Sequence, residues 1–264
     1  MSSREHRLLA TDRRVRAMFG GEVIADTPAA WMGFGGYKPP LYELGTWWFD
    51  RAHVRTELLQ VSDHRTVCDV RGPATYWDIV AGGRRVPHGA YAYEQAPDGW
   101  EALRGLITFA WNEIDHWYEE ELEVFVHPRG PMHRVDALRS SRHVQVSLDG
   151  VPLADTTRPV ALFETGMPVR WYIPRADIAL EHLTESSTRT QCPYKGVAEY
   201  YTVRAGDFVL EDLAWTYTFP VVECRRIAQH VCFFSERVDI TLDGEPQTRP
   251  QTKWEREIPA RDVL

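Results

Sequence analysis

The sequence contains no apolar run that approaches the roughly 20 residues a helix needs to cross a bilayer. Residues 1–7 carry charges but lead into no apolar stretch of the kind found in a secretory signal peptide. The chain has 264 residues, of which 44% are hydrophobic and 26% charged. This composition is typical of a soluble globular protein, and the length suits two domains of ordinary size. We therefore expect a cytoplasmic protein with no membrane partner.

Cysteine is scarce, and the four cysteines, Cys68, Cys192, Cys224 and Cys232, are scattered along the chain. A disulfide framework in a chain of this length needs more of them, so we expect free thiols. No Cys-x-x-Cys pair is present, which argues against a structural zinc site. The histidines at 116, 127, 133 and 143 match no metal-ligand spacing, so we expect them at the surface or between the domains. We predict neither a metal nor a cofactor.

Several catalytic signatures are also missing. There is no Gly-x-x-x-x-Gly-Lys-Ser/Thr phosphate loop and no Gly-x-Gly-x-x-Gly dinucleotide fingerprint. There is likewise no Gly-x-Ser-x-Gly elbow and no His-Glu-x-x-His motif. The formal net charge of −8 lacks the basic excess that phosphate binding requires, so we expect no nucleic-acid partner.

The chain does contain an internal repeat. Gln-Cys-Pro-Tyr-Lys-Gly at 191–196 shares its Cys and Gly with Cys-Asp-Val-Arg-Gly at 68–72, at an offset of 124 positions (192 − 68). An earlier Ala-Asp-Thr occurs at 25–27 and again at 154–156, at an offset of 129 positions (154 − 25). These matches indicate a tandem duplication.

Both copies read as series of short strands separated by turns. Residues 144–148 alternate apolar and polar side chains, and Asp149-Gly150 is a preferred pair for a tight hairpin turn. The best helical segment, 175–183 after Pro174, covers only about two turns. We therefore predict an all-β protein with little helix. The expected divisions are a first repeat at 11–126, a connector at 127–140, a second repeat at 141–246 and a C-terminal tail at 247–264.

Several runs resemble a bacterial family known only as domain of unknown function 427, sometimes labelled nucleotidyltransferase-like. The resemblance covers residues 11 to 246 and rests on these runs: 149–156, 162–166, 192–196, 214–217 and 236–239. It implies an Mss4-like β-tent in each copy. Relatives of that architecture often hold zinc on paired Cys-x-x-Cys motifs, which this sequence lacks, so the metal is not carried over.

The second copy is the better candidate for activity, because the first replaces the Pro, Tyr and Lys of the motif with Asp69, Val70 and Arg71. Lys195 is a candidate anion clamp or Schiff-base amine. Positive charge persists at position 71 while the amine does not, which favours anion binding. Cys192 is either a nucleophile or a small buried residue that shapes the loop. Glu164 is a candidate general base.

Further residues are candidates for ligand binding. Arg189 would hold an anionic or carbonyl group together with Lys195. Tyr200, Trp215 and Tyr217 would line the apolar part of a pocket. In the first copy, Arg71 and Tyr76 occupy the equivalent positions of Lys195 and Tyr200.

Three functional hypotheses remain open at this point. The first is a small-molecule enzyme or ligand-binding protein, working without a metal, with its pocket beside the motif of the second repeat. The second is a non-catalytic module that binds another protein. The third is a metal-dependent nucleotidyltransferase, although the Gly-Ser and Asp-x-Asp pattern of such enzymes is missing. The sequence leaves open the substrate, the reaction and the oligomeric state.

Overall fold

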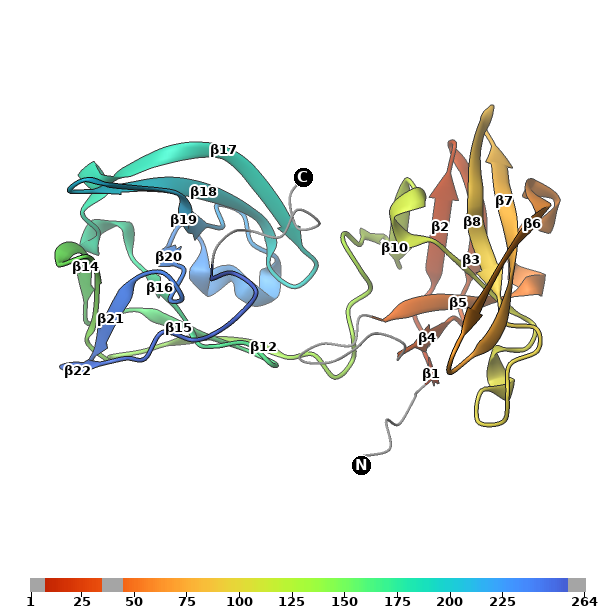
Figure 1. Cartoon of the computed structure of the whole chain (residues 1–264), viewed down its shortest axis with the longest axis horizontal. Coiled ribbons are helices and arrows are strands. Elements are labelled where there is room, and N and C mark those ends of the chain that lie inside the picture. The colour runs from red at the N-terminus through yellow and green to blue at the C-terminus, as the bar shows by residue number, and fades with distance from the viewer. Residues whose placement is uncertain (1–7, 35–44, 256–264) are drawn as a thin grey trace. The chain divides into compact units, whose positions relative to one another are not determined.

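A computed structural model describes residues 8–34 and 45–255 of the chain (Figure 1). The chain divides into two compact units, residues 1–130 and 131–264. Each unit contains a seven-stranded sheet and a four-stranded sheet, and the strands follow the same order in both units. The all-β tandem duplication predicted from the sequence is confirmed. In the described ranges, no helix is long and apolar enough to cross a membrane.

In the first unit, the large sheet has the order β1-β4-β5-β9-β8-β7-β6 and the small sheet the order β11-β10-β2-β3. The strands are β1 Leu8–Ala10, β2 Val15–Phe19, β3 Glu22–Thr27, β4 Trp31–Gly33, β5 Thr46–Asp50, β6 Leu59–Cys68, β7 Gly72–Ala81, β8 Arg84–Ala92, β9 Leu106–Phe109, β10 His116–Glu119 and β11 Leu122–Glu123. The 3-10 turns are η1 Arg51–His53, η2 Thr56–Leu58, η3 Glu101–Leu103 and η4 Trp111–Glu113.

In the second unit, the large sheet has the order β12-β15-β16-β20-β19-β18-β17 and the small sheet the order β14-β13-β21-β22. The strands are β12 Val135–Arg139, β13 Val144–Leu148, β14 Val151–Thr156, β15 Val160–Glu164, β16 Arg170–Ile173, β17 Leu183–Cys192, β18 Gly196–Ala205, β19 Phe208–Thr216, β20 Val231–Phe233, β21 Asp239–Leu242 and β22 Glu245–Pro246. The 3-10 turns are η5 Arg175–Asp177, η6 Leu180–His182 and η7 Val222–Ile227.

The core of each unit lies between its two sheets. Along β13 the side chains of Val144, Val146 and Leu148 are buried, as the alternating pattern predicts. They join one apolar cluster with Tyr172 of β16 and Val203 of β18, so the small sheet covers one face of the large sheet. Burial of this apolar area is the main force that holds the two sheets together.

Two segments differ from the expectation. The helix predicted at 175–183 is instead a pair of 3-10 turns, η5 and η6, followed directly by β17. A segment this short cannot recover the cost of nucleating an α-helix. Residues 135–139, within the range expected to be a connector, form β12, which pairs antiparallel with β15.

The segment after β22 packs on the second unit. Arg170 and Glu236 form a buried ion pair with N–O distances of 2.7 Å. The hydroxyl of Thr252 donates a hydrogen bond of 2.6 Å to Glu236, and the ring of Trp254 lies 5.8 Å from the Arg170 guanidinium. These contacts satisfy a buried carboxylate, which would otherwise be costly. The described part of the predicted tail is therefore an integral part of the second unit.

The longest hairpin of each unit is closed by the motif turn. Lys195 N–H donates to the Cys192 carbonyl at 3.3 Å, and Gly196 starts β18 with a φ of +105°. A Cβ at Gly196 would lie 3.3 Å from the Phe219 carbonyl oxygen. In the first unit, Gly72 also has a positive φ, of +83°. Glycine is needed here because other residues avoid this conformation.

We predict that Gly196→Ala destabilises the second unit by about 1–3 kcal/mol, because it adds both backbone strain and a tight contact. Equilibrium urea unfolding measures the loss. Gly206→Ala is the matched control, because Gly206 also has a positive φ (+58°) but has no atom within 4 Å of an added Cβ. A loss no larger than that of the control would contradict the packing argument.

Candidate functional site

The motif turn places Lys195 between two other segments of the second unit. The start of η7 packs against the turn, because the backbone N–H of Val221 donates to the Lys195 carbonyl at 3.1 Å. The thiol of Cys224, on η7, contacts the Tyr194 carbonyl at 3.3 Å. Both contacts fix the backbone of the turn, so the position of the Lys195 side chain is determined by the fold.

Lys195, Glu164 and His133 form a buried charged cluster. The Lys195 ammonium donates to a Glu164 carboxylate oxygen at 2.6 Å, and the other oxygen lies 3.1 Å from Nε2 of His133. The three side chains are only 11%, 10% and 12% exposed. The His133 ring also stacks on Tyr194 with 4.2 Å between ring centres. The cluster therefore unites the motif turn, the end of β15 and the segment before β12.

The electrostatics of the cluster favour its ionised form. Burial by itself disfavours the Glu164 carboxylate, but the charge of Lys195 and the hydrogen bonds from His133 and Lys195 lower the pKa of Glu164 to about 2. Burial likewise favours a neutral Lys195 amine, but the acidic groups of Cys192, Glu164 and Tyr172 outweigh it and raise the pKa of Lys195. Lys195 is therefore an ammonium, which suits an anion clamp and not a Schiff-base nucleophile.

The hydrogen bonds leave some capacity in the cluster. An ammonium has three donors, and within the described ranges the Lys195 ammonium donates a hydrogen bond to Glu164 alone. The ionised Glu164 is an acceptor only, so His133 donates the hydrogen bond between them from Nε2. The Lys195 ammonium thus offers further hydrogen-bond donors for an anion or a carbonyl.

Aromatic side chains and thiols surround the ion pair. Tyr172 is buried, and its hydroxyl accepts a hydrogen bond of 3.0 Å from Trp215. Tyr217 is also buried, with its ring centre 6.4 Å from that of Tyr172. Burial raises the pKa of both phenols well above the ordinary value. Cys192 is partly exposed, whereas burial raises the pKa of the Cys224 thiol to about 11.

The remaining two predicted residues of the second repeat lie on opposite faces of the β17–β18 hairpin. Tyr200 is buried, and its hydroxyl lies 2.9 Å from that of Thr190. Arg189 is 38% exposed and donates to the carbonyls of Ser186 and Thr188 at 2.8 Å. These carbonyls belong to a bulge in the edge strand. The structure does not bring Arg189 to Lys195.

The first repeat builds a different environment from the equivalent positions. Arg71 is buried, with its guanidinium 5.1 Å from the Trp100 ring centre and 5.9 Å from that of Tyr93. The residue that corresponds to Glu164 at an offset of 129 is a glycine, Gly35, which lies outside the described residues. Tyr76 bonds Thr66 at 2.9 Å, as Tyr200 bonds Thr190. The shared tyrosine contact belongs to the fold, whereas the residue types of the charged cluster do not recur.

Sequence reasoning missed the part played by His133, which was expected at the surface or between the domains. It is instead one of the least exposed charged or polar residues near the motif, because β12 carries it beside the end of β15. No spacing in the sequence links position 133 to 164 or 195. Nowhere in residues 8–34 or 45–255 do three or more His, Cys, Asp or Glu side chains form a group suited to hold a metal ion.

Two all-β repeats, each with a long hairpin closed by a Cys-x-x-x-Gly turn, define a tandem-repeat protein whose two motif turns differ in chemistry. The chain belongs to the family described as Domain of unknown function (DUF427), which matches residues 7–120 and again 136–244. These two ranges correspond to the two units. No curated protein matches the chain.

We predict that Glu164 makes stability depend on pH in the acid range. Its pKa of about 2 lies below the ordinary value of 4.5, so the ionised carboxylate stabilises the fold above about pH 4.5 and loses this effect as the pH falls towards 2. Between about pH 6 and pH 3 the wild-type chain should lose about 2 kcal/mol more stability than Glu164→Gln.

Urea unfolding at each pH measures this difference. The control is Glu185→Gln, which removes an exposed glutamate from β17 and should leave the wild-type pH dependence unchanged. Parallel pH profiles for wild type and Glu164→Gln would show that the buried pair does not hold Glu164 ionised.

Proposed function

We propose that the second repeat binds a small anionic or carbonyl-containing metabolite at the His133–Glu164–Lys195 cluster and acts on it by metal-free acid–base chemistry. The observation that carries the proposal is the burial of this cluster at the motif turn of the second repeat, where the first repeat has Arg71 in place of Lys195. Buried charges are costly and often mark functional sites. Because the first repeat has the same strand order without the same residues, the fold itself does not require them.

Each member of the cluster has a distinct role in this proposal. Lys195 would use its remaining N–H donors to hold a carboxylate or a carbonyl oxygen of the ligand. His133 would accept or return a proton through its imidazole ring, and Glu164 would orient both groups and stabilise the charged ring. Tyr172 and Tyr217 would supply the apolar and aromatic part of the surroundings.

The outer part of the ligand would lie along η7. A hollow there is lined by Val222, Glu223, Arg225 and Arg226. It adjoins the motif turn, because Val221 bonds the Lys195 carbonyl. Arg225 and Arg226 are exposed and would attract an anion towards the cluster. A second hollow, lined by residues of β3 and η1, belongs to the first unit and has no part in the proposal.

A second candidate is a non-catalytic module that binds another protein. One observation favours it: Phe219, just before η7, and Val222, its first residue, are 88% and 68% exposed. Apolar side chains this exposed are typical of interaction sites when they gather into a patch. The two candidates differ in which residues matter, since a docking surface would depend on Phe219 and Val222 and not on His133.

The test begins with native mass spectrometry of the purified chain, to detect a retained small molecule. Pyruvate, acetate and inorganic phosphate then serve as probes in calorimetry. We expect Lys195→Gln to weaken binding at least about tenfold, because it removes a charged hydrogen-bond donor. The double variant Glu164→Gln/Lys195→Gln removes both charges together and should fold, yet bind as weakly. The control is Lys253→Gln, which removes a lysine elsewhere in the second unit and should leave binding of the probes unchanged.

Chemistry is tested separately from binding. We expect the wild-type chain to exchange the methyl hydrogens of pyruvate with deuterium from the solvent, followed by NMR. His133→Gln should retain binding and lose most of this exchange. If no retained molecule and no probe binds in a manner that depends on Lys195, the proposal is wrong. Binding that instead fails in Phe219→Asp would favour the protein-interaction module.

A further inference from the structure

One edge of the large sheet in the first unit is open. Strand β6 is the last strand in the order of that sheet, and among the described residues it pairs on one side only, with β7. The free side of an edge strand presents backbone N–H and C=O groups that can pair with a strand of another chain. With ten residues, β6 is longer than a typical strand of about 5–6 residues, so the open edge is long.

Two large apolar side chains lie on this edge. Val61 and Val67 are 74% and 75% exposed. They pair with Trp77 and Pro73, which are an even number of positions apart on β7, so both valines are on the same face of the sheet. Natural proteins usually protect an open edge with charge, proline or a short strand. Two exposed valines therefore indicate a contact surface.

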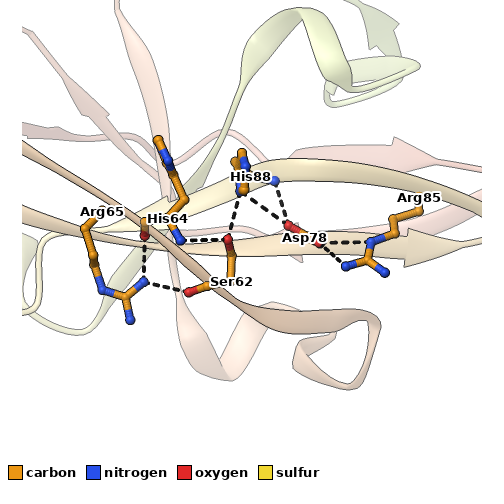
Figure 2. Close-up of polar contacts among 6 residues, drawn as sticks. All are labelled: Ser62, His64, Arg65, Asp78, Arg85 and His88. Atoms are coloured by element: carbon orange, nitrogen blue, oxygen red, sulfur yellow. Dashed lines mark hydrogen bonds and ion pairs between the residues drawn. The ribbon is translucent and has the colours of Figure 1, made fainter.

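Between the two valines the strand bulges, and part of the bulge backbone is bonded within the chain (Figure 2). The hydroxyl of Ser62 accepts the backbone N–H of His64 at 3.1 Å. The guanidinium of Arg65 donates to the carbonyls of Ser62 and His64, both at 2.6 Å. Alternate residues of an antiparallel strand direct their backbone groups to opposite sides. A strand that joins this edge would therefore bond the residues that alternate with Ser62 and His64, namely 61, 63, 65 and 67.

Two copies of this edge are complementary to each other. The sequence from 61 to 67 is Val-Ser-Asp-His-Arg-Thr-Val, which is a chemical palindrome about His64. Antiparallel pairing around a two-fold axis at His64 places each residue opposite the one at the same distance on the other side. Asp63 then faces Arg65 of the second copy, and Val61 faces Val67. Opposite charges and apolar pairs on neighbouring strands stabilise a sheet.

The two charged side chains are exposed and available for this contact. Within the described ranges, neither Asp63 nor Arg65 forms a salt bridge. Arg65 uses only Nη1 for the two carbonyls of the bulge, which leaves Nε and Nη2 to donate to a carboxylate. The contact between copies thus adds ion pairs without breaking the hydrogen bonds of the bulge.

The second repeat contains the same bulge. On β17 the hydroxyl of Ser186 accepts the backbone N–H of Thr188 at 3.1 Å. Arg189 donates to the carbonyls of Ser186 and Thr188, both at 2.8 Å. The bulge and its arginine, which are common to both repeats, therefore belong to the fold.

The exposed residues around the bulge differ between the repeats. The shared strand order forms in the second repeat without the palindrome, which is particular to the first. At an offset of 124, Val61, Asp63 and Val67 correspond to Glu185, Ser187 and Gln191.

We propose that two copies of the chain form a dimer in which β6 pairs antiparallel with β6 of the second copy, about a two-fold axis at His64. The large sheets of the two first units then join edge to edge. Such a contact is isologous, so it closes on itself and leaves no free β6 for a third copy. Seven paired residues make a smaller interface than that of a permanent dimer, so we expect the association to be reversible.

Sedimentation velocity of the full chain over a series of concentrations tests the proposal. We expect the wild-type chain to shift reversibly from monomer to dimer as its concentration rises. Val61→Glu/Val67→Gln introduces the residues of the second repeat and should raise the dissociation constant at least about tenfold, because it removes both apolar pairs. The control is Val209→Gln, which removes an exposed valine from β19 of the second unit and should leave dimerisation unchanged.

Charge reversal tests the register of the pairing. Asp63→Arg places arginines opposite each other, and Arg65→Asp does the same with aspartates. Each variant alone should therefore dimerise at least about tenfold more weakly than wild type. An equimolar mixture of the two should regain a dimer, because each copy then supplies the charges that complement the other. Pairing in another register would not give this rescue.

Three results would overturn the proposal. They are a wild-type chain that stays monomeric at every concentration, dimerisation that is unchanged by the valine double variant or by Asp63→Arg, and a mixture of the two folded charge variants that does not dimerise. Circular dichroism shows whether Arg65→Asp, which loses its bonds to the bulge carbonyls, has folded. If it has not, the other two variants carry the test.

The dimer and the ligand site can be tested independently. Binding of the probes at Lys195 should be the same in all the β6 variants, because β6 belongs to the first unit and Lys195 to the second. Failure of the dimer is therefore distinguishable from failure of the ligand site.

Discussion

The closing turn of the longest hairpin in each unit depends on a backbone conformation that only glycine adopts at little cost. Gly196 and Gly72 provide it, and Cys192 and Cys68 pair directly across from them. Once this turn is formed, the register of two ten-residue strands follows. The register in turn sets which side chains enter the core and directs Lys195 towards β15. The position of the charged cluster is therefore set by the backbone of the turn that contains Lys195.

Comparison of the two repeats distinguishes side-chain contacts that both units share from those found in one unit. Contacts that recur in both units, such as Tyr200 with Thr190 and Tyr76 with Thr66, maintain the sheet. Polar groups that differ between the units do not determine the strand order, because the same order forms without them. By this reasoning the two buried ion pairs of the second unit, Lys195 with Glu164 and Arg170 with Glu236, are additions to the shared fold. Divergence after duplication has thus changed side chains and left the strand order unchanged.

The fold was predictable from the sequence because its signals are local. The alternation in β13 and the Asp149-Gly150 turn depend only on neighbouring residues, and both are present in the structure. The pairing of Lys195 with Glu164 was not predictable, because it joins strands that lie far apart in the sequence. The sequence could not show on which face of the sheet Arg189 lies, for a different reason. A bulge between Glu185 and Arg189 shifts the register of β17 against β18. Counting alternate residues along β17 therefore does not tell which side chains share a face.

The segment that carries Thr252 and Trp254 shows that the second structural unit extends beyond the repeated range. The family match ends at residue 244, before both residues. A fragment cut at that boundary would keep every strand up to β21 but would uncover Glu236, whose carboxylate relies on Thr252 as well as Arg170. Boundaries drawn from similarity between copies therefore describe ancestry. Boundaries drawn from buried charge describe what must be kept together for the second unit to fold.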